Sequence, residues 1–185
     1  MPSATRRQGR EWAVQMLFQA DLNPGVDVDE MIKDFWEQQW TCQMDANHQQ
    51  APTRKQAKKR VPDRVAPHDI REFAEFRVRG VLEHQDEIDQ LLQKFADNWS
   101  LYRIATVERN VLRLCCFELL YCPAVPPAVV LNEAVDLAKY FSNTEAGRFV
   151  NGILDKINKT YVAKAQAEAT KTPASDGAAE EGLNG

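Results

Sequence analysis

Long apolar runs are missing from this sequence of 185 residues, and glycine and proline are sparse. No stretch of 18 apolar residues occurs, so no membrane-spanning helix is expected. No apolar segment follows the basic N-terminal residues, so no secretory signal peptide is expected either. The 8 glycines and 9 prolines are too few for a collagen-like chain or a linker. Hydrophobic residues make up 44% of the chain and charged residues 27%, which is typical of an ordinary globular domain.

Cysteine is also scarce. The chain has four cysteines, at Cys42, Cys115, Cys116 and Cys122, and no C-x-x-C pair. A disulfide framework would need more cysteines in a shorter chain. We therefore expect small buried hydrophobic side chains in a reducing cytoplasm rather than a thiol or metal site.

The motifs that carry cofactor or metal chemistry are absent from the sequence. Neither G-x-G-x-x-G nor the phosphate-binding loop G-x-x-x-x-G-K-[ST] occurs. The paired Glu-x-x-His motifs of di-iron bundles are missing as well. We expect His48, His68 and His84 to be solvated side chains rather than ligands or bases. The sequence thus predicts no cofactor, no metal site and no enzyme activity.

Helical periodicity runs through most of the chain. Apolar residues recur at three- and four-residue spacing, and no alternating strand pattern is found. Ser3 or Thr5 can cap the first helix, and the segment 104–121 is apolar enough that other helices should surround it. The fold class predicted is all-α, one compact bundle of about seven helices. We expect them at about 4–20, 27–40, from 68 onward, and at 86–99, 104–121, 127–141 and 145–162.

Two segments interrupt the single helical domain that we expect over residues 1–163. Residues 41–67 are polar and contain three prolines, so we expect a mobile insertion; its residues 54–64 hold six basic side chains. Residues 164–185 carry almost no large apolar side chain. Such a segment cannot offset its ordering entropy by burial, so we expect a disordered acidic tail.

Positive charge gathers near the N-terminus although the net charge is −4. Arg6 and Arg10 are one helical turn apart with Arg7 beside them, and three such cations can meet three phosphates. Arg148 and Phe149 form a second pair, suited to a phosphate and a stacked base. Taken alone, the three arginines are also typical of solubilising terminal charge. Arg148 and Phe149 taken alone are also typical of a surface charge beside a core phenylalanine.

Two glutamates of the segment 104–121 are expected to behave differently. Glu118 falls on the apolar side of this helix, where a buried carboxylate needs a partner. We expect a salt bridge to an arginine of another helix rather than a catalytic role. Glu108 falls on the polar arc with Arg109 and Arg113, where a solvated face is expected.

Several linked motifs lie within residues 107–157. They are Glu118-Leu119, Asn132-Glu133-Ala134-Val135, Leu137-Ala138-Lys139 and Phe149-Val150-Asn151-Gly152-Ile153-Leu154-Asp155-Lys156. The N-terminal segment, residues 6–18, has the form RRxxRExAVQxLF. Taken together, these motifs resemble the NusB family of transcription antitermination factors, with similarity over about residues 1–40 and 68–160.

The resemblance implies a cytoplasmic, all-helical RNA-binding protein. Members of the family pair with NusE, a ribosomal protein of the small subunit, and bind the single-stranded boxA element of nascent ribosomal RNA. This helps RNA polymerase in the antitermination complex to read through terminators. The resemblance also implies Glu108 at the NusE side. It places the RNA contacts at Arg6, Arg7, Arg10, Phe18, Glu145, Arg148 and Phe149.

The chain departs from the family pattern at several positions. Gln8 and Gly9 interrupt the basic run, and Phe18 stands where tyrosine is common. One alternative is a helical protein-interaction module of the same fold without RNA binding, which salt-dependent RNA binding would distinguish. Another is the NusB-like N-terminal domain of an RNA cytosine methyltransferase. The second is disfavoured, because only the acidic tail follows the bundle where that enzyme needs a cofactor-binding domain.

Overall fold

The computed structural model describes residues 5–46, 66–96 and 100–162, and these residues form an all-helical bundle without strands. The predicted fold class is therefore confirmed. In the described residues no helix is long and apolar enough to cross a membrane. The elements are α1 (Arg6–Leu22), α2 (Val28–Ala46), α3 (His68–Glu83), α4 (Gln85–Phe95), η1 (Leu101–Arg103), α5 (Thr106–Tyr121), α6 (Pro127–Phe141), α7 (Thr144–Ile157) and a π-helical turn, η2 (Asn158–Val162).

Short polar side chains define where several helices begin. The Thr5 hydroxyl accepts a hydrogen bond from the Gln8 amide at the start of α1, so Thr5 is the cap. Asn143 caps α7 in the same way, through a 2.9 Å bond from the Ala146 amide. Pro127 occupies the first turn of α6, where its missing amide proton costs nothing.

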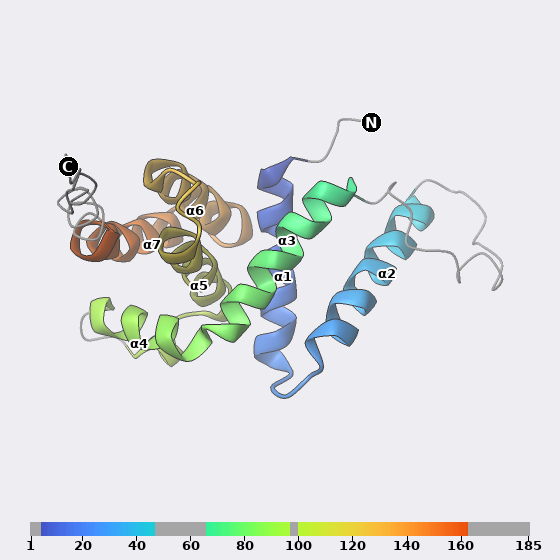
Figure 1. The fold of residues 1–185 in the computed structure, drawn as a ribbon, viewed down its shortest axis with the longest axis horizontal. Helices are drawn as coiled ribbons and strands as arrows, with labels where there is room; N and C mark the ends of the chain where they lie inside the picture. The colour runs from blue at the N-terminus through green and yellow to red at the C-terminus, as the bar shows by residue number, and fades with distance from the viewer. Residues whose placement is uncertain (1–4, 47–65, 97–99, 163–185) are drawn as a thin grey trace, which may run out of the picture.

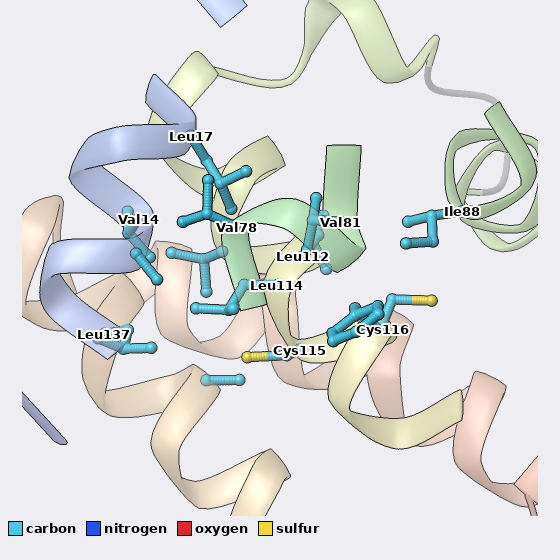
Figure 2. Close-up of a cluster of buried hydrophobic side chains, with 14 of the residues drawn as sticks. Val14, Leu17, Val78, Val81, Ile88, Leu112, Leu114, Cys115, Cys116 and Leu137 are labelled. Carbon is cyan, nitrogen blue, oxygen red and sulfur yellow. The ribbon is translucent and has the colours of Figure 1, made fainter. Parts of the chain in front are cut away.

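Helix α5 forms the centre of the bundle. It packs against α1, α3, α4, α6 and α7, while α2 packs against α1 and lies at the edge of the molecule (Figure 1). Figure 2 shows buried side chains from several helices, including Val14, Val78, Ile88 and Leu137, meeting residues of α5. The expectation that helices surround the segment 104–121 is therefore confirmed.

The cysteine prediction is right for three of the four residues. Cys115, Cys116 and Cys122 are buried free thiols, and burial raises the pKa of Cys116 to about 12. The prediction is wrong for Cys42, because its side chain is exposed on α2. The neighbouring Thr41 is exposed as well.

Helix α2 continues past its predicted end at residue 40, and the first residues of the predicted insertion 41–67 are helical. The backbone can continue the helix without an apolar stripe, because no proline or glycine occurs before Pro52. At the other end, Ala66 is buried and Pro67 precedes α3. Residues 47–65, with the basic cluster, and the predicted tail lie outside the described residues.

Candidate nucleic-acid interface

The start of α1 presents two arginines toward solvent. Arg6 is exposed, and its guanidinium carbon lies 5.8 Å from the centroid of the Phe73 ring on α3. Arg7 is partly exposed and reaches α6, where its Nη1 donates to Asp136 Oδ2 at 3.0 Å. Its Nε donates to Glu11 at 3.1 Å. Burial acts to lower the pKa of Arg7, but these two hydrogen bonds raise it above its ordinary value.

Arg10 does not belong to this surface, and the expectation that it is exposed beside Arg6 and Arg7 is wrong. Only 3% of Arg10 is accessible to solvent. Its Nε donates to Glu118 Oε2 of α5 at 3.0 Å, and its Nη1 lies 3.6 Å from Glu133 Oε2 of α6. A phosphate has no access to this guanidinium, so Arg10 holds helices together instead.

Glu118 is the centre of a buried ionic cluster, as its position on the apolar side of α5 predicts. Its second oxygen accepts a hydrogen bond from Arg77 of α3, so it bridges two arginines from two helices. With Glu133 beside Arg10, two cations face two carboxylates. Burial lowers the pKa of Arg77, and the Glu118 carboxylate offsets part of that effect. A buried charge needs such a partner, because it loses its hydration.

Phe73 connects this cluster to the exposed Arg6. The guanidinium carbons of Arg10 and Arg77 lie 5.3 and 3.2 Å from its ring centroid, so three arginines surround one aromatic ring. Gly9 makes this packing possible, since a Cβ there would lie 2.8 Å from Phe73 Cδ1. The glycine that appears in the sequence as a break in the basic run is therefore a close contact between α1 and α3.

The α6–α7 hairpin supplies the second cationic part of the surface. Arg148 is exposed on the first turns of α7, and its Nη1 donates to Glu145 Oε1 at 2.9 Å. The next residue, Phe149, is half-buried and packs against the core. Lys139 of α6 is exposed. Its side chain lies beside α7, since a Cβ on Gly147 would lie 3.1 Å from Lys139 Cγ. No pattern in the sequence pointed to Lys139 as a site residue.

One surface therefore joins three helices. The Arg7–Asp136 pair links α1 to α6, and the contact between Gly147 and Lys139 links α6 to α7. We call the exposed residues Arg6, Arg7, Lys139 and Arg148 the cationic face. Phe18 lies 12 residues after Arg6 in the same helix, about 18 Å away, and is half-buried. The structure does not bring it together with the arginines.

Glu108 lies at the start of α5 and is partly exposed, so the solvated position that the sequence suggested applies to part of its side chain. The Ser142 hydroxyl at the end of α6 donates to Glu108 Oε1 at 2.8 Å. Its Oε2 is buried and has no hydrogen-bond partner among the described residues. The neighbouring Arg109 and Arg113 are buried instead, which is a correction to the expected polar arc.

A second ionic cluster explains why that arc is buried. Asp21 of α1 lies 2.6 Å from Arg109 and 3.0 Å from Arg113, and Arg113 also pairs with Asp89 of α4 at 2.7 Å. Burial alone would raise the pKa of Asp21, but hydrogen bonds from the two arginines bring it below its ordinary value. These pairs connect α1, α4 and α5, and their role is structural.

The fold and this surface define a class of protein, an all-helical bundle around one central helix with a cationic face built from α1, α6 and α7. Among the described residues no group of three or more histidine, cysteine or acidic side chains is placed to hold a metal ion. The chain belongs to the NusB family, whose model matches residues 7–159. The resemblance seen in the sequence is therefore confirmed.

Individual relatives agree with this assignment. The transcription antitermination protein NusB of Myxococcus xanthus is 40% identical over 152 residues, which cover 82% of this chain and 93% of the relative. That of Syntrophotalea carbinolica is 37% identical over 160 residues, covering 86% and 96%. Thermotoga maritima NusB superimposes with a TM-score of 0.68 at 29% identity, covering 90% of this chain and 99% of that chain.

A solved complex is also similar. A structure of the antitermination factors NusB and NusE in complex with double-stranded RNA contains a chain that matches with a TM-score of 0.61 at 29% identity. The match covers 84% of this chain and 97% of that chain.

Proposed function

We propose that this protein is a transcription antitermination factor that binds boxA-like single-stranded RNA together with NusE. It acts in the cytoplasm on nascent ribosomal RNA, within the RNA polymerase antitermination complex, and helps the polymerase to read through terminators. The proposed role is one of binding and involves no catalysis. The observation that carries the proposal is the family match over residues 7–159, which reaches from the first turn of α1 into η2.

The cationic face is the proposed RNA site. Arg6, Arg7 and Arg148 can each contact a phosphate, and Lys139 adds a fourth cation between them. Arginine is well suited to this task because its planar guanidinium binds phosphate through two hydrogen bonds and stacks on bases. Arg10 supports the site from inside the bundle. Glu145, beside Arg148, competes with phosphate for that arginine.

Phe149 and Phe18 are less accessible to bound RNA than the sequence suggested. The Phe149 ring is half-buried against the core, so only part of it can contact a base. Phe18 would require RNA to follow α1 for about three turns from Arg6. We retain both residues in the proposal as secondary contacts.

NusE is the proposed protein partner, and Glu108 remains the residue expected on its side of the bundle. Its position at the junction of α5 with the end of α6 is set by the 2.8 Å bond from Ser142. The Oε1 side of the carboxylate is the exposed one, so a NusE donor would meet Glu108 there, beside the Ser142 hydroxyl.

The test is an RNA-binding titration with and without NusE at fixed salt. A labelled boxA-like strand is compared with a scrambled strand and with the corresponding duplex. We expect weak affinity for the protein alone, tighter binding of the boxA-like strand when NusE is present, and a loss of affinity with salt. Binding of NusE without any RNA binding would instead favour the alternative of a protein-interaction module. Binding of neither would reject the proposal.

A further inference from the structure

Tyr140 is an exposed aromatic residue on the same side of α6 as the first arginines. Its exposed fraction is 64%, the larger of the two exposed large apolar side chains of α6, the other being Val129 at 43%. Tyr140 is one helical turn after Asp136, and residues four apart lie on one face of a helix. Asp136 pairs with Arg7, so this face of α6 is the one that meets α1.

The direction of the two helices places Tyr140 near the start of α1. Arg10 lies near Glu133, and Arg7 pairs with Asp136, so α6 runs toward its C-terminus while α1 runs back toward its N-terminus. One more turn along α6, about 6 Å, leads from Asp136 to Tyr140. The preceding residue, Lys139, is the one that lies beside α7. Tyr140 therefore lies on the side of α6 that meets α1, one turn beyond Asp136, while its neighbour Lys139 faces α7.

The ring of Tyr140 is supported from one side. Its centroid lies 4.9 Å from that of Phe141 with an interplanar angle of 80°, so the two rings meet edge to face. Phe141 is partly buried and packs against the core. An aromatic side chain held in this way loses little conformational entropy when a flat ligand contacts its exposed surface.

Tyr102 is an exposed tyrosine away from the cationic face and serves as a comparison for Tyr140. Tyr102 is 78% exposed in η1 beside the exposed Arg103, and the guanidinium of Arg109, 5.9 Å from its ring, is engaged by Asp21. No member of the cationic face adjoins it in the sequence. Single-stranded RNA needs both elements together, an aromatic surface for the base and cations for the flanking phosphates.

We propose that Tyr140 is a base-stacking residue of the RNA interface. An unpaired base of the bound strand lies on its exposed ring, while the arginines of α1 and Arg148 contact phosphates on either side. The inference rests on the proposed function. It also assigns to Tyr140 the stacking role that the sequence had suggested for the half-buried Phe149.

The test compares Tyr140→Ala, Tyr140→Phe and the control Tyr102→Ala in the presence of NusE. Stacking on an aromatic ring carries sequence-tolerant affinity, so Tyr140→Ala should weaken binding about 5- to 150-fold without changing the salt slope. Tyr140→Phe and Tyr102→Ala should bind like the unchanged protein. Because Tyr140 is exposed, thermal melts of all three variants should coincide with that of the parent.

Fluorescence of 2-aminopurine reports the stacking directly. The analogue is placed at each position of the strand in turn, and one position should show quenching that Tyr140→Ala abolishes. Unchanged affinity of Tyr140→Ala would overturn the inference while leaving RNA binding intact. An equal loss in Tyr140→Phe would also overturn it, by assigning the contact to the hydroxyl. If the parent protein binds no RNA, the proposed function itself fails.

Discussion

Arg10 and Glu118 form a buried ion pair at 3.0 Å although they are 108 residues apart in the chain. Arg77 completes the pairing of Glu118 from a third helix, and Glu133 lies near Arg10 on a fourth. The cluster therefore fixes α1, α3, α5 and α6 relative to one another. Arg7 pairs with α6 one turn away from this cluster. The ion pair therefore also sets the distance between the part of the cationic face on α1 and the part on α6 and α7.

Arg10→Gln should destabilise the protein strongly. Breaking a buried ion pair leaves an uncompensated charge, and here Glu133 also loses its partner, so the free energy of unfolding should fall by about 3 kcal/mol. Urea denaturation measures this, with Arg6→Gln as the control because it makes the same change at an exposed site of the same helix. Equal stabilities of the two variants would show that the cluster contributes nothing.

Arg6→Gln combined with Arg7→Gln should change how RNA affinity depends on salt. Each lost phosphate contact reduces the slope of log affinity against log salt by roughly 0.7 for single-stranded RNA, so the slope should become shallower by about 1.4. Arg79→Gln is the matched control, since Arg79 pairs with Asp29 of α2. A salt titration that gives the same slope for the double variant and the parent would remove α1 from the RNA site.

Asp136→Asn should strengthen RNA binding. The carboxylate holds the Arg7 guanidinium at 3.0 Å and competes with phosphate for it. Exposed pairs of this kind are worth up to about 1 kcal/mol, so the gain should reach at most about fivefold. Asp155→Asn serves as the control, because Asp155 pairs with Lys159 near the far end of α7. Weaker binding of Asp136→Asn would mean that the pair positions Arg7 for RNA rather than restraining it.

Asp21→Asn should reduce stability in a pH-dependent way. The pKa of Asp21 in the folded state lies below its ordinary value of 3.8, so its contribution is present above that value and is lost as pH falls through the folded pKa. At pH 7 the variant should lose about 2 kcal/mol of unfolding free energy, and the difference from the parent should shrink below about pH 4. Denaturation at pH 7, 5 and 3.5 measures it. A difference that stays constant with pH would rule out the ion pairs as its source.

The pattern of apolar residues determined much of the architecture. A three- and four-residue period predicts helices because residues at those spacings share one helical face. It located the start of each of the seven described helices to within a few residues, but the ends of α2, α4 and α7 differ by four to six residues and no end was predicted for α3. Glu118 was predictable for a similar reason. A carboxylate on an apolar face must be paired, so an arginine of another helix was expected before its identity was known.

The tertiary structure alone decided which charged residues face solvent. Arg6, Arg7 and Arg10 are equivalent in the sequence, and only the docking of α3, α5 and α6 on α1 buries the third and leaves the other two at least partly exposed. The same holds for Arg109 and Arg113. Their sequence positions predict a solvated arc, but α1 and α4 place Asp21 and Asp89 against them. Helical periodicity gives the angle of each side chain about its own axis, but burial depends on which neighbouring helix covers that angle, and this is set by contacts between residues far apart in the chain.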